Sequence, residues 1–407
     1  MPQIVIRHDR EKPVIQQHPW IFSGAIQEVR GDPAPGDIVD VVSTKGRFLA
    51  RGYWNQKSQI QVRILTWQDE PINDDWWRRM MQQAIVARSS GLPSNMPDKM
   101  AKRLINAESD WLPGLVVDRY ADFLVLQALT LGIDRRKHDI ARLLHELMPE
   151  VKGIYERSDV DVRGKEGLKP QSGLLWGGEP PEYIEIQESG SKFLVDMRKG
   201  HKTGFYLDQS ANRVIAQNYV EKLNRLFERP LKILNLCSYT GGFAISIINQ
   251  RIASITCVDA SYEVLELAER NAELNLTANN TPELEFLQAD VFQLLRDYVD
   301  QGEKFDFIIC DPPKFAHNAG QVDKAARGYK DLNLHCFKLL NSGGYLMTFS
   351  CSGAISTDLF QKIVFGALVD SGRQGQIVEY LSAAPDHPVA LTFPEGAYLK
   401  GLLTRVM

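Results

Sequence analysis

The chain has 407 residues, of which 44% are hydrophobic and 24% are charged, and its formal net charge is −4. This length allows two or three domains with buried cores, and the composition is typical of a globular protein rather than a disordered or fibrous one. The near-neutral total gives no global signal for nucleic-acid binding, although local basic patches can exist within it.

The termini and the cysteines indicate a cellular compartment. Residues 1–10 lack a long apolar segment, and no run of about 18 apolar residues exists, so neither a secretory signal nor a membrane span is expected. The odd number of cysteines and the absence of a CxxC pair predict reduced thiols in a cytoplasmic protein without a metal site. The cysteines are Cys237, Cys257, Cys310, Cys336 and Cys351.

Residues 1–70 are predicted to form a β-rich domain. Short apolar runs at 37–42, 47–53 and 60–65 are separated by Gly, Ser, Asn and Lys, as in a small barrel or sandwich. Arginine and lysine residues are spread along this region and are nearly balanced by acidic residues. A solvated face accounts for such charges as well as a nucleic-acid surface does, so the pattern leaves both open.

Residues 71–180 are predicted to form a small α+β domain. Its expected elements are a helix over 76–89, a hairpin over 115–129, a helix over 135–148 and a strand over 153–157. Asp74 is the expected N-cap of the first helix. The segment 164–181 is rich in Gly, Pro and Ser and is interpreted as the boundary to the next domain. We interpret four neighbouring charged residues as an exposed loop: Asp159, Asp161, Arg163 and Lys165.

Residues 181–407 are predicted to form an α/β domain with a mostly parallel, doubly wound sheet, because strands and helices alternate from residue 231 onward. A hairpin over 184–196 precedes the alternation. The expected strands are 232–236, 254–258, 284–287, 305–310 and 345–349, and the expected helices are 243–249, 262–275, 324–340 and 358–371.

Polar residues follow several of these strands. The loop after the first strand holds Gly241 and Gly242, which let backbone approach a ligand, but it is not GxGxxG and so gives little support for a dinucleotide. Asp259 ends the second strand and could accept hydrogen bonds from both hydroxyls of a ribose. Asp290 follows the third strand and could contact an adenine amino group. Because carboxyl ends of parallel strands meet at one sheet edge, a nucleoside-cofactor site is favoured.

The fourth of these strands ends at Asp311-Pro312-Pro313-Lys314-Phe315. Proline has no N–H to donate, so the strand must stop, and Asp311 is presented at its carboxyl end. A carboxylate beside rigid prolines and an aromatic ring could hold a planar base with exocyclic N–H groups. An ordinary strand exit has the same pattern, so this stretch alone leaves its role open.

Five segments in this order resemble the ribosomal RNA large subunit methyltransferase I family, which makes 5-methylcytosine in 23S rRNA. They are HPWIFSG at 18–24, GFYLDQ at 204–209, SYTGGF at 238–243, DPPKF at 311–315 and FSCSG at 349–353. The resemblance implies an N-terminal PUA domain, a central α+β domain and a C-terminal Rossmann-like domain. It also implies S-adenosylmethionine as cofactor and 23S rRNA as partner, and it allows a homodimer.

The resemblance further implies the site residues. The implied cofactor contacts are Tyr206, Asp208, Asn235, Cys237, Ser238, Tyr239, Gly241, Asp259, Ala260, Ser261, Asp290, Val291 and Asp311. The implied substrate contacts are Pro312, Pro313, Phe315 and Arg213. Two residues depart from the family pattern: Ser210 stands where the family usually has Arg, and Trp111 where it usually has Gly. Arg213 is the candidate to replace the contact that Ser210 cannot make.

Cys351 is the predicted nucleophile. Cytosine C5 is barely nucleophilic, and addition of a thiolate to C6 makes C5 enamine-like. Lys314 is a candidate cation to raise the thiolate fraction, and Asp311 would hold the N3/N4 edge of the base. A related two-cysteine family has a second cysteine where Lys314 stands, so the base that removes the C5 proton is unassigned. A buried structural thiol is the alternative interpretation of Cys351, as expected for Cys257, Cys310 and Cys336.

Three other functions fit parts of the sequence. A guanine or adenine nitrogen methyltransferase would need the Asp-Pro-Pro segment but not Cys351. A small-molecule methyltransferase is disfavoured by the additional N-terminal domains. A non-catalytic RNA-binding module with a degenerate fold is the third.

Overall fold

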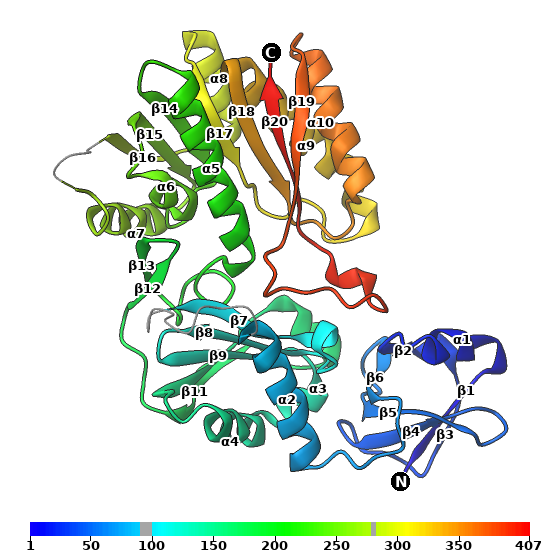
Figure 1. Ribbon diagram of the computed structural model, residues 1–407. Coiled ribbons are helices and arrows are strands. Elements are labelled where there is room, and N and C mark those ends of the chain that lie inside the picture. The colour runs from blue at the N-terminus through cyan, green and yellow to red at the C-terminus, as the bar shows by residue number, and fades with distance from the viewer. Residues whose placement is uncertain (90–99, 278–281) are drawn as a thin grey trace. The chain divides into compact units, whose positions relative to one another are not determined.

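A computed structural model describes residues 1–89, 100–277 and 282–407 (Figure 1). By their contacts these residues form two compact units. The first comprises 1–186, 195–207 and 386–396, and the second comprises 187–194, 208–385 and 397–407. Among the described helices, none has the length and apolar character needed to cross a membrane.

The first unit begins with a six-stranded sheet in the order β2-β6-β5-β4-β1-β3. Its strands are β1 (Gln3–Ile6), β2 (Trp20–Phe22), β3 (Ile26–Arg30), β4 (Ile38–Val42), β5 (Phe48–Trp54) and β6 (Ile60–Thr66), and α1 (Glu11–Ile15) precedes β2. Alternating residues such as Val39 and Val41 point into its core, where both are fully buried. The β-rich prediction and its three apolar runs are confirmed.

The same unit contains a five-stranded sheet in the order β11-β10-β9-β8-β7. Its elements are α2 (Asp74–Ser89), β7 (Ala101–Asn106), β8 (Leu115–Tyr120), β9 (Phe123–Ala128), α3 (Leu131–Asp134), α4 (Lys137–Leu147), β10 (Gly153–Ser158) and β11 (Gln171–Gly177). The predicted helices and hairpin are confirmed. The N-cap prediction was wrong by one residue, because the side chain of Asn73, not Asp74, accepts a 3.0 Å hydrogen bond from the Trp76 N–H.

The domain boundary over 164–181 stays a prediction. The segment contains β11, which pairs antiparallel with β10, so its Gly and Ser residues lie in a strand as well as in loops. One interpretation of this region was wrong. Arg163 is not in an exposed loop. It is 2% exposed, lies in a 3-10 helix over Asp161–Glu166, and binds the Lys169 carbonyl and the Asp134 carboxylate.

Buried cations in this unit are neutralised by carboxylates. Lys137 is 6% exposed, and its ammonium lies 2.9 Å from Glu156 and 3.2 Å from Asp134. Gln171 adds a hydrogen bond of 2.8 Å. Further pairs of this kind are Arg63 with Glu108 and Glu166, Arg88 with Asp110, and Arg163 with Asp134.

The second unit is built on a seven-stranded sheet in the order β16-β15-β14-β17-β18-β20-β19. Its strands are β14 (Leu231–Leu236), β15 (Ile252–Asp259), β16 (Glu283–Gln288), β17 (Phe305–Cys310), β18 (Leu340–Ser350), β19 (Gly375–Ser382) and β20 (Lys400–Val406). Strand β20 runs antiparallel to both of its neighbours, and the remaining pairs are parallel. The prediction of a mostly parallel, doubly wound sheet is confirmed.

Helices pack in two layers on this sheet (Figure 1). The layers are α5 (Ser210–Leu226), α6 (Gly242–Ile247) and α7 (Tyr262–Glu273), and α8 (Val291–Gln301), α9 (Val322–Leu339) and α10 (Thr357–Asp370). The order of the strands reverses between β14 and β17, and such a switch point opens a crevice at the carboxyl ends of the strands. The predicted residues therefore gather where this fold binds ligands.

The predicted hairpin is confirmed as β12 (Ile184–Glu188) and β13 (Ser191–Val195). The chain first passes from one unit to the other within it. Four elements of the second unit were not predicted: α5, α8, β19 and β20. Strand β19 is largely exposed, and so it lacks the continuous apolar run of a buried strand.

Candidate active site

The loop between β14 and α6 is shaped by unusual backbone angles. Cys237 and Tyr239 have φ of 53° and 49°, and Gly241 has φ of 78°. A side chain at Gly241 would lie 3.2 Å from the Ala268 Cβ, so the close packing of this turn needs glycine. Strained non-glycine residues of this kind are common at ligand sites, because surrounding structure must hold them in place.

Two buried hydroxyls of this loop have no hydrogen-bond partner within the described part of the chain. They belong to Ser238 and Thr240, which are 6% and 2% exposed. A buried polar group without a partner is costly, so such a group usually meets a ligand or an ordered water. The loop thus has donors and acceptors for a polar ligand.

The carboxylates after β15 and β16 have defined local partners. Asp259 accepts hydrogen bonds from the backbone N–H of Tyr239 at 2.9 Å and of Ser261 at 3.1 Å. Asp290 accepts from the backbone N–H of Gln293 at 2.9 Å and is the N-cap of α8. Asp290 therefore has a structural role that the sequence interpretation missed, since α8 was not predicted.

The carboxylates converge on one thiol. Burial raises the pKa of Cys237 well above its usual value, and Cys310, Asp259, Asp311 and Asp290 raise that pKa further. The structure therefore brings the loop after β14 together with the ends of β15 and β17 and the residue after β16. It also keeps the Cys237 thiol protonated.

Asp311 is held by a residue that the sequence interpretation left out of the site. The Gln209 side-chain N–H donates to the Asp311 carboxylate at 2.9 Å, and Asn212 donates to the Gln209 carbonyl at 2.5 Å. Gln209 follows Asp208, whose carboxylate accepts a 2.6 Å hydrogen bond from the Tyr398 hydroxyl. The signal for Gln209 was present, because it ends the segment 204–209.

The residues after Asp311 differ in exposure. Pro312 is buried, whereas Pro313 and Lys314 are exposed. The Phe315 ring packs against Tyr329 and Phe292, with centroid distances of 4.7 and 6.1 Å. This packing places Phe315 at the edge of the hydrophobic core, so its predicted contact with a substrate would use only the exposed part of its ring.

Arg213 lies on α5 and is 2% exposed. Its guanidinium binds the Glu188 carboxylate through two hydrogen bonds of 2.6 and 2.8 Å. Its predicted role as a substrate contact stays a prediction, and that role would require the guanidinium to bind an additional anion beside Glu188.

Cys351 follows β18 directly, and β18 pairs parallel with β17, so the predicted neighbourhood of Cys351 and Asp311 is confirmed. The residue is partly exposed and lies between the fully buried Ser350 and Ser352. The Ser352 hydroxyl accepts from the Ala316 N–H at 3.2 Å and lies 3.0 Å from the Tyr329 hydroxyl. One side chain thus ties the loop of Cys351 to the loop of Asp311.

A buried lysine that the sequence did not predict lies beside this loop. Lys400 is 5% exposed and pairs with Ser350 across β18 and β20. Its ammonium donates to the carbonyls of Ser352 and Ile355, each at 2.7 Å. Burial lowers the pKa of Lys400 to about 8, attraction to Cys351 opposes this shift, and repulsion from Lys314 adds to it.

Known proteins match the whole chain. A family model for a PUA-like domain matches residues 4–67, and one for an S-adenosylmethionine-dependent methyltransferase matches residues 160–405. A ribosomal RNA large subunit methyltransferase I from Tolumonas auensis is 47% identical over 406 residues, which are 99% of each chain. The chain belongs to this family. A member from Escherichia coli O157:H7 is 44% identical over 411 residues, which are 100% of this chain and 99% of that one.

Solved structures agree on the fold. A chain described as a SAM-dependent methyltransferase from Streptococcus mutans superposes with a TM-score of 0.80 at 20% identity, covering 99% of this chain and 100% of that one. A methyltransferase structure complexed with SAH has a TM-score of 0.82 at the same identity and coverage. The predicted PUA-like and Rossmann-like domains are confirmed by these matches, and so is S-adenosylmethionine as the cofactor of the family.

The carboxyl-end edge of the methyltransferase sheet fits this cofactor chemically. The ligand is a nucleoside joined to an amino acid, and it needs acceptors for ribose hydroxyls and for an amino group. Asp259 and Asp290 supply carboxylates, and Ser238 and Thr240 supply the buried hydroxyls described above. Tyr206 lies in the other unit, where it contacts His201 at 3.3 Å and Lys202 at 4.2 Å, so its role stays a prediction.

The backbone angle at residue 111 explains why glycine is usual there in the family. Trp111 has φ of 57°, which is the left-handed region that glycine adopts without strain. The family's usual glycine suits this position, and the chain places a 45% exposed tryptophan there. Ser210, the second departure, begins α5.

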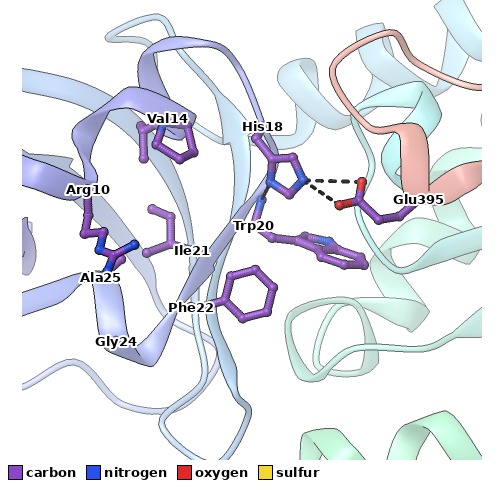
Figure 2. Close-up of a pocket in the computed structure, with 10 residues that line it drawn as sticks. Arg10, Val14, His18, Trp20, Ile21, Phe22, Gly24, Ala25 and Glu395 are labelled. Atoms are coloured by element: carbon purple, nitrogen blue, oxygen red, sulfur yellow. Dashed lines mark hydrogen bonds and ion pairs between the residues drawn. The ribbon is translucent and has the colours of Figure 1, made fainter. Parts of the chain in front are cut away.

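A cavity of about 470 Å³ is lined by residues of the PUA-like domain and by Glu395, which belongs to the same compact unit (Figure 2). Its walls are mostly apolar, with polar side chains at Arg10, His18 and Glu395, and the His18 imidazole lies 3.3 and 3.4 Å from the Glu395 carboxylate oxygens. Phe22 is 49% exposed at this cavity. The lining residues are Arg10, Pro13, Val14, His18, Trp20, Ile21, Phe22, Gly24, Ala25 and Glu395.

Proposed function

We propose that the protein methylates C5 of one cytosine in 23S rRNA through a covalent bond between Cys351 and C6 of the base. One observation carries the proposal. Two cysteines of the site are partly exposed, and their electrostatic surroundings are opposite. Burial, the neighbouring Cys310 and nearby carboxylates disfavour the thiolate of Cys237. The Lys400 ammonium instead binds two carbonyls of the turn after Cys351, and its positive charge attracts the Cys351 thiolate.

Different residues of the chain then carry out different steps of the reaction. Bound S-adenosylmethionine supplies an electrophilic methyl group. The Cys351 thiolate adds to C6, which makes C5 electron-rich enough to take that methyl group. Loss of the C5 proton to a base then allows the C6–S bond to break, and the thiolate is regenerated. Asp311, which accepts a hydrogen bond from Gln209, would accept another from the base edge during the addition.

The cofactor would lie along the ends of β14, β15 and β16. We assign the ribose hydroxyls to Asp259 and the adenine amino group to Asp290, with Ala260, Ser261 and Val291 beside them. Asn235, Cys237, Ser238, Tyr239 and Gly241 would surround the amino-acid part, next to Asp208. The two buried hydroxyls of the loop support this assignment.

The relatives are ribosomal RNA large subunit methyltransferases, which supports RNA as the substrate. We assign the protein's affinity for RNA to the PUA-like domain. The cavity of Figure 2 supports this role, because the half-exposed Phe22 offers a ring for base stacking and Arg10 offers a cation for a phosphate. Stacking of a base on an aromatic side chain contributes about 1–3 kcal/mol.

The covalent step is tested with RNA that carries 5-fluorocytosine at the target. Fluorine cannot leave as a proton does, so wild type should form a stable protein–RNA adduct. Cys351→Ala should form none and should keep its affinity for S-adenosylmethionine. Cys336→Ala, a change at a buried thiol outside the site, is the matched control and should form the adduct. Methylated RNA without any adduct would instead support methylation of a ring nitrogen.

The RNA contact is tested with surface substitutions. Deleting the PUA-like domain would strip Glu108 and Glu166 of their partner Arg63, so point variants are cleaner. Phe22→Ala should weaken RNA binding about 5-fold or more through lost stacking. Arg10→Ala should reduce the salt slope of binding by about 1. Val29→Ala, at an exposed residue of the same domain, should change neither quantity. If Phe22→Ala and Arg10→Ala change RNA affinity and its salt slope no more than Val29→Ala does, RNA binds elsewhere.

A further inference from the structure

Lys400 is a buried lysine of the site, and its ammonium forms hydrogen bonds with the loop that carries Cys351. Its two acceptors, the carbonyls of Ser352 and Ile355, belong to the turn that immediately follows Cys351. An ammonium has three donors, and in the described part of the chain no protein acceptor meets the third. Within the described ranges no carboxylate forms an ion pair with it, and the charged groups that act on it are Cys351 and Lys314, so no carboxylate cancels its positive charge.

The position of this charge is fixed by strand pairing. Lys400 begins β20 opposite Ser350, the last residue of β18, and Cys351 is the next residue along the chain. The backbone of a sheet holds such a register tightly, because a slip of one residue would turn the side chain to the other face. Strand pairing and these two hydrogen bonds thus hold the cation at the carboxyl end of β18, against the turn that follows Cys351.

Several titratable groups lie near this thiol, and they differ in how they can affect it. Asp311 follows the neighbouring strand β17, and its negative charge opposes the thiolate. Lys314 is exposed, and water and salt screen its charge. Tyr329 carries a hydroxyl that is engaged with Ser352, and burial raises the pKa of Tyr329, so it stays neutral. Lys400 is buried, where a charge acts more strongly than at the surface.

We propose that Lys400 is a positioning residue for the nucleophile: it fixes the turn after Cys351 through two carbonyls and sets an uncompensated positive charge beside the sulfur, which favours the thiolate. This inference rests on the proposed function for its catalytic meaning, but not for its test. Lys400 acts through Cys351 and needs no contact with the base. The proton lost by the thiol goes to solvent, and below about pH 8 the ammonium keeps its own.

The test measures the thiol directly, without RNA. The full-length protein is alkylated with iodoacetamide across about pH 6 to 10, and the rate at Cys351 is read by mass spectrometry of its peptide, because only the thiolate reacts. Lys400→Met should raise the midpoint by about 1 pH unit or more, which is about a 10-fold slower reaction near neutral pH. Lys400→Arg keeps the cation and should stay nearer to wild type. Lys314→Met, the exposed control, should move the midpoint less.

A second measurement needs no variant and so remains decisive if Lys400→Met fails to fold. The wild-type midpoint is measured at about 0.05 M and about 0.5 M salt, where the screening length differs about threefold. A buried cation predicts nearly equal midpoints, whereas a midpoint that rises with salt assigns the effect to Lys314 and overturns the proposal. An unchanged midpoint in a folded Lys400→Met protein overturns it as well.

The two proposals fail in different ways. If wild type forms no adduct with 5-fluorocytosine RNA while Lys400→Met still shifts the Cys351 midpoint, the covalent mechanism is wrong and the electrostatic inference stands. If the adduct forms and the midpoint is unaffected by Lys400→Met, the mechanism stands and another group activates the thiol.

Discussion

Lys137 and Lys400 are buried to nearly the same degree, at 6% and 5% exposure, but their partners differ. Lys137 lies between two carboxylates and an amide, so its charge is cancelled where it is buried. Lys400 donates to two backbone carbonyls, which satisfy hydrogen bonds but carry no net charge. The comparison separates a buried cation that stabilises a fold from one that leaves a positive field in a site.

The difference extends beyond these two residues. Other buried cations of the first unit, Arg63, Arg88 and Arg163, each meet at least one carboxylate. A pairing of this kind suits a scaffold, because removing either partner leaves an uncompensated buried charge. Leaving a charge unpaired costs stability, and it is therefore expected mainly where the charge acts on something else.

The largest expected effect is a loss of stability when Lys137, the buried cation that is paired with carboxylates, is replaced. Lys137→Met should lower the free energy of unfolding by about 3–5 kcal/mol, because the Glu156 carboxylate would be left buried without its cation. Urea denaturation of the full-length protein measures this change. The double variant Lys137→Met/Glu156→Gln should recover much of the loss, and failure to recover would show that Lys137 acts through packing rather than through charge.

A smaller effect is expected for a carboxylate at the site. Asp259→Ala should weaken S-adenosylmethionine binding about 10-fold or more, since a charge-assisted hydrogen bond contributes about 1.5–3 kcal/mol. Because Asp259 accepts hydrogen bonds from the backbone N–H groups of Tyr239 and Ser261, the loss in unfolding free energy should be smaller than for Lys137→Met. Calorimetric titration with the cofactor measures the first quantity, and unchanged affinity would remove Asp259 from the cofactor site.

The smallest expected effect is a pH dependence of the unfolding free energy that arises from Lys400. The pKa of Lys400 is lowered to about 8 in the folded protein from 10.5, so between these values the unfolded chain binds more protons than the folded one. Stability from this residue therefore rises as pH increases through this range. The unfolding free energy of wild type minus that of Lys400→Met should increase from about pH 7 to pH 10. A flat difference would mean that the folded protein holds this proton as tightly as the unfolded chain does.

The sequence predicted the elements whose pattern is local. Strand β17 was recognisable because its apolar run ends at Asp311-Pro312, and α2 because its apolar residues recur at helical spacing. The strand ends placed Asp259, Asp290 and Asp311 correctly at one sheet edge, since parallel strands share that edge. Cys351 was placed beside the Asp311 strand by the same reasoning, and the pairing of β17 with β18 confirms it.

The site residues that the sequence did not reveal depend on contacts between residues far apart in the chain. Lys400 lies in β20, an antiparallel strand near the end of the chain, and nothing local links it to residue 351. Gln209 reaches Asp311 across 102 positions. The roles of Asp290 as an N-cap and of Phe315 as a core ring were hidden because α8 was not predicted and because the neighbours Tyr329 and Phe292 are set by helix packing.

The placement of Cys351 between two buried serines, at a partly exposed strand end, has a consequence for oxidation. Peroxides react with thiolates, so the feature that would make this sulfur a nucleophile also makes it the thiol most open to conversion to a sulfenic acid. Cys257, Cys310 and Cys336 are shielded by burial, and Cys237 by the carboxylates around it. Air-exposed protein should therefore lose its activity through a single sulfur, and a reductant should restore it while the sulfenic acid or a disulfide is the only product.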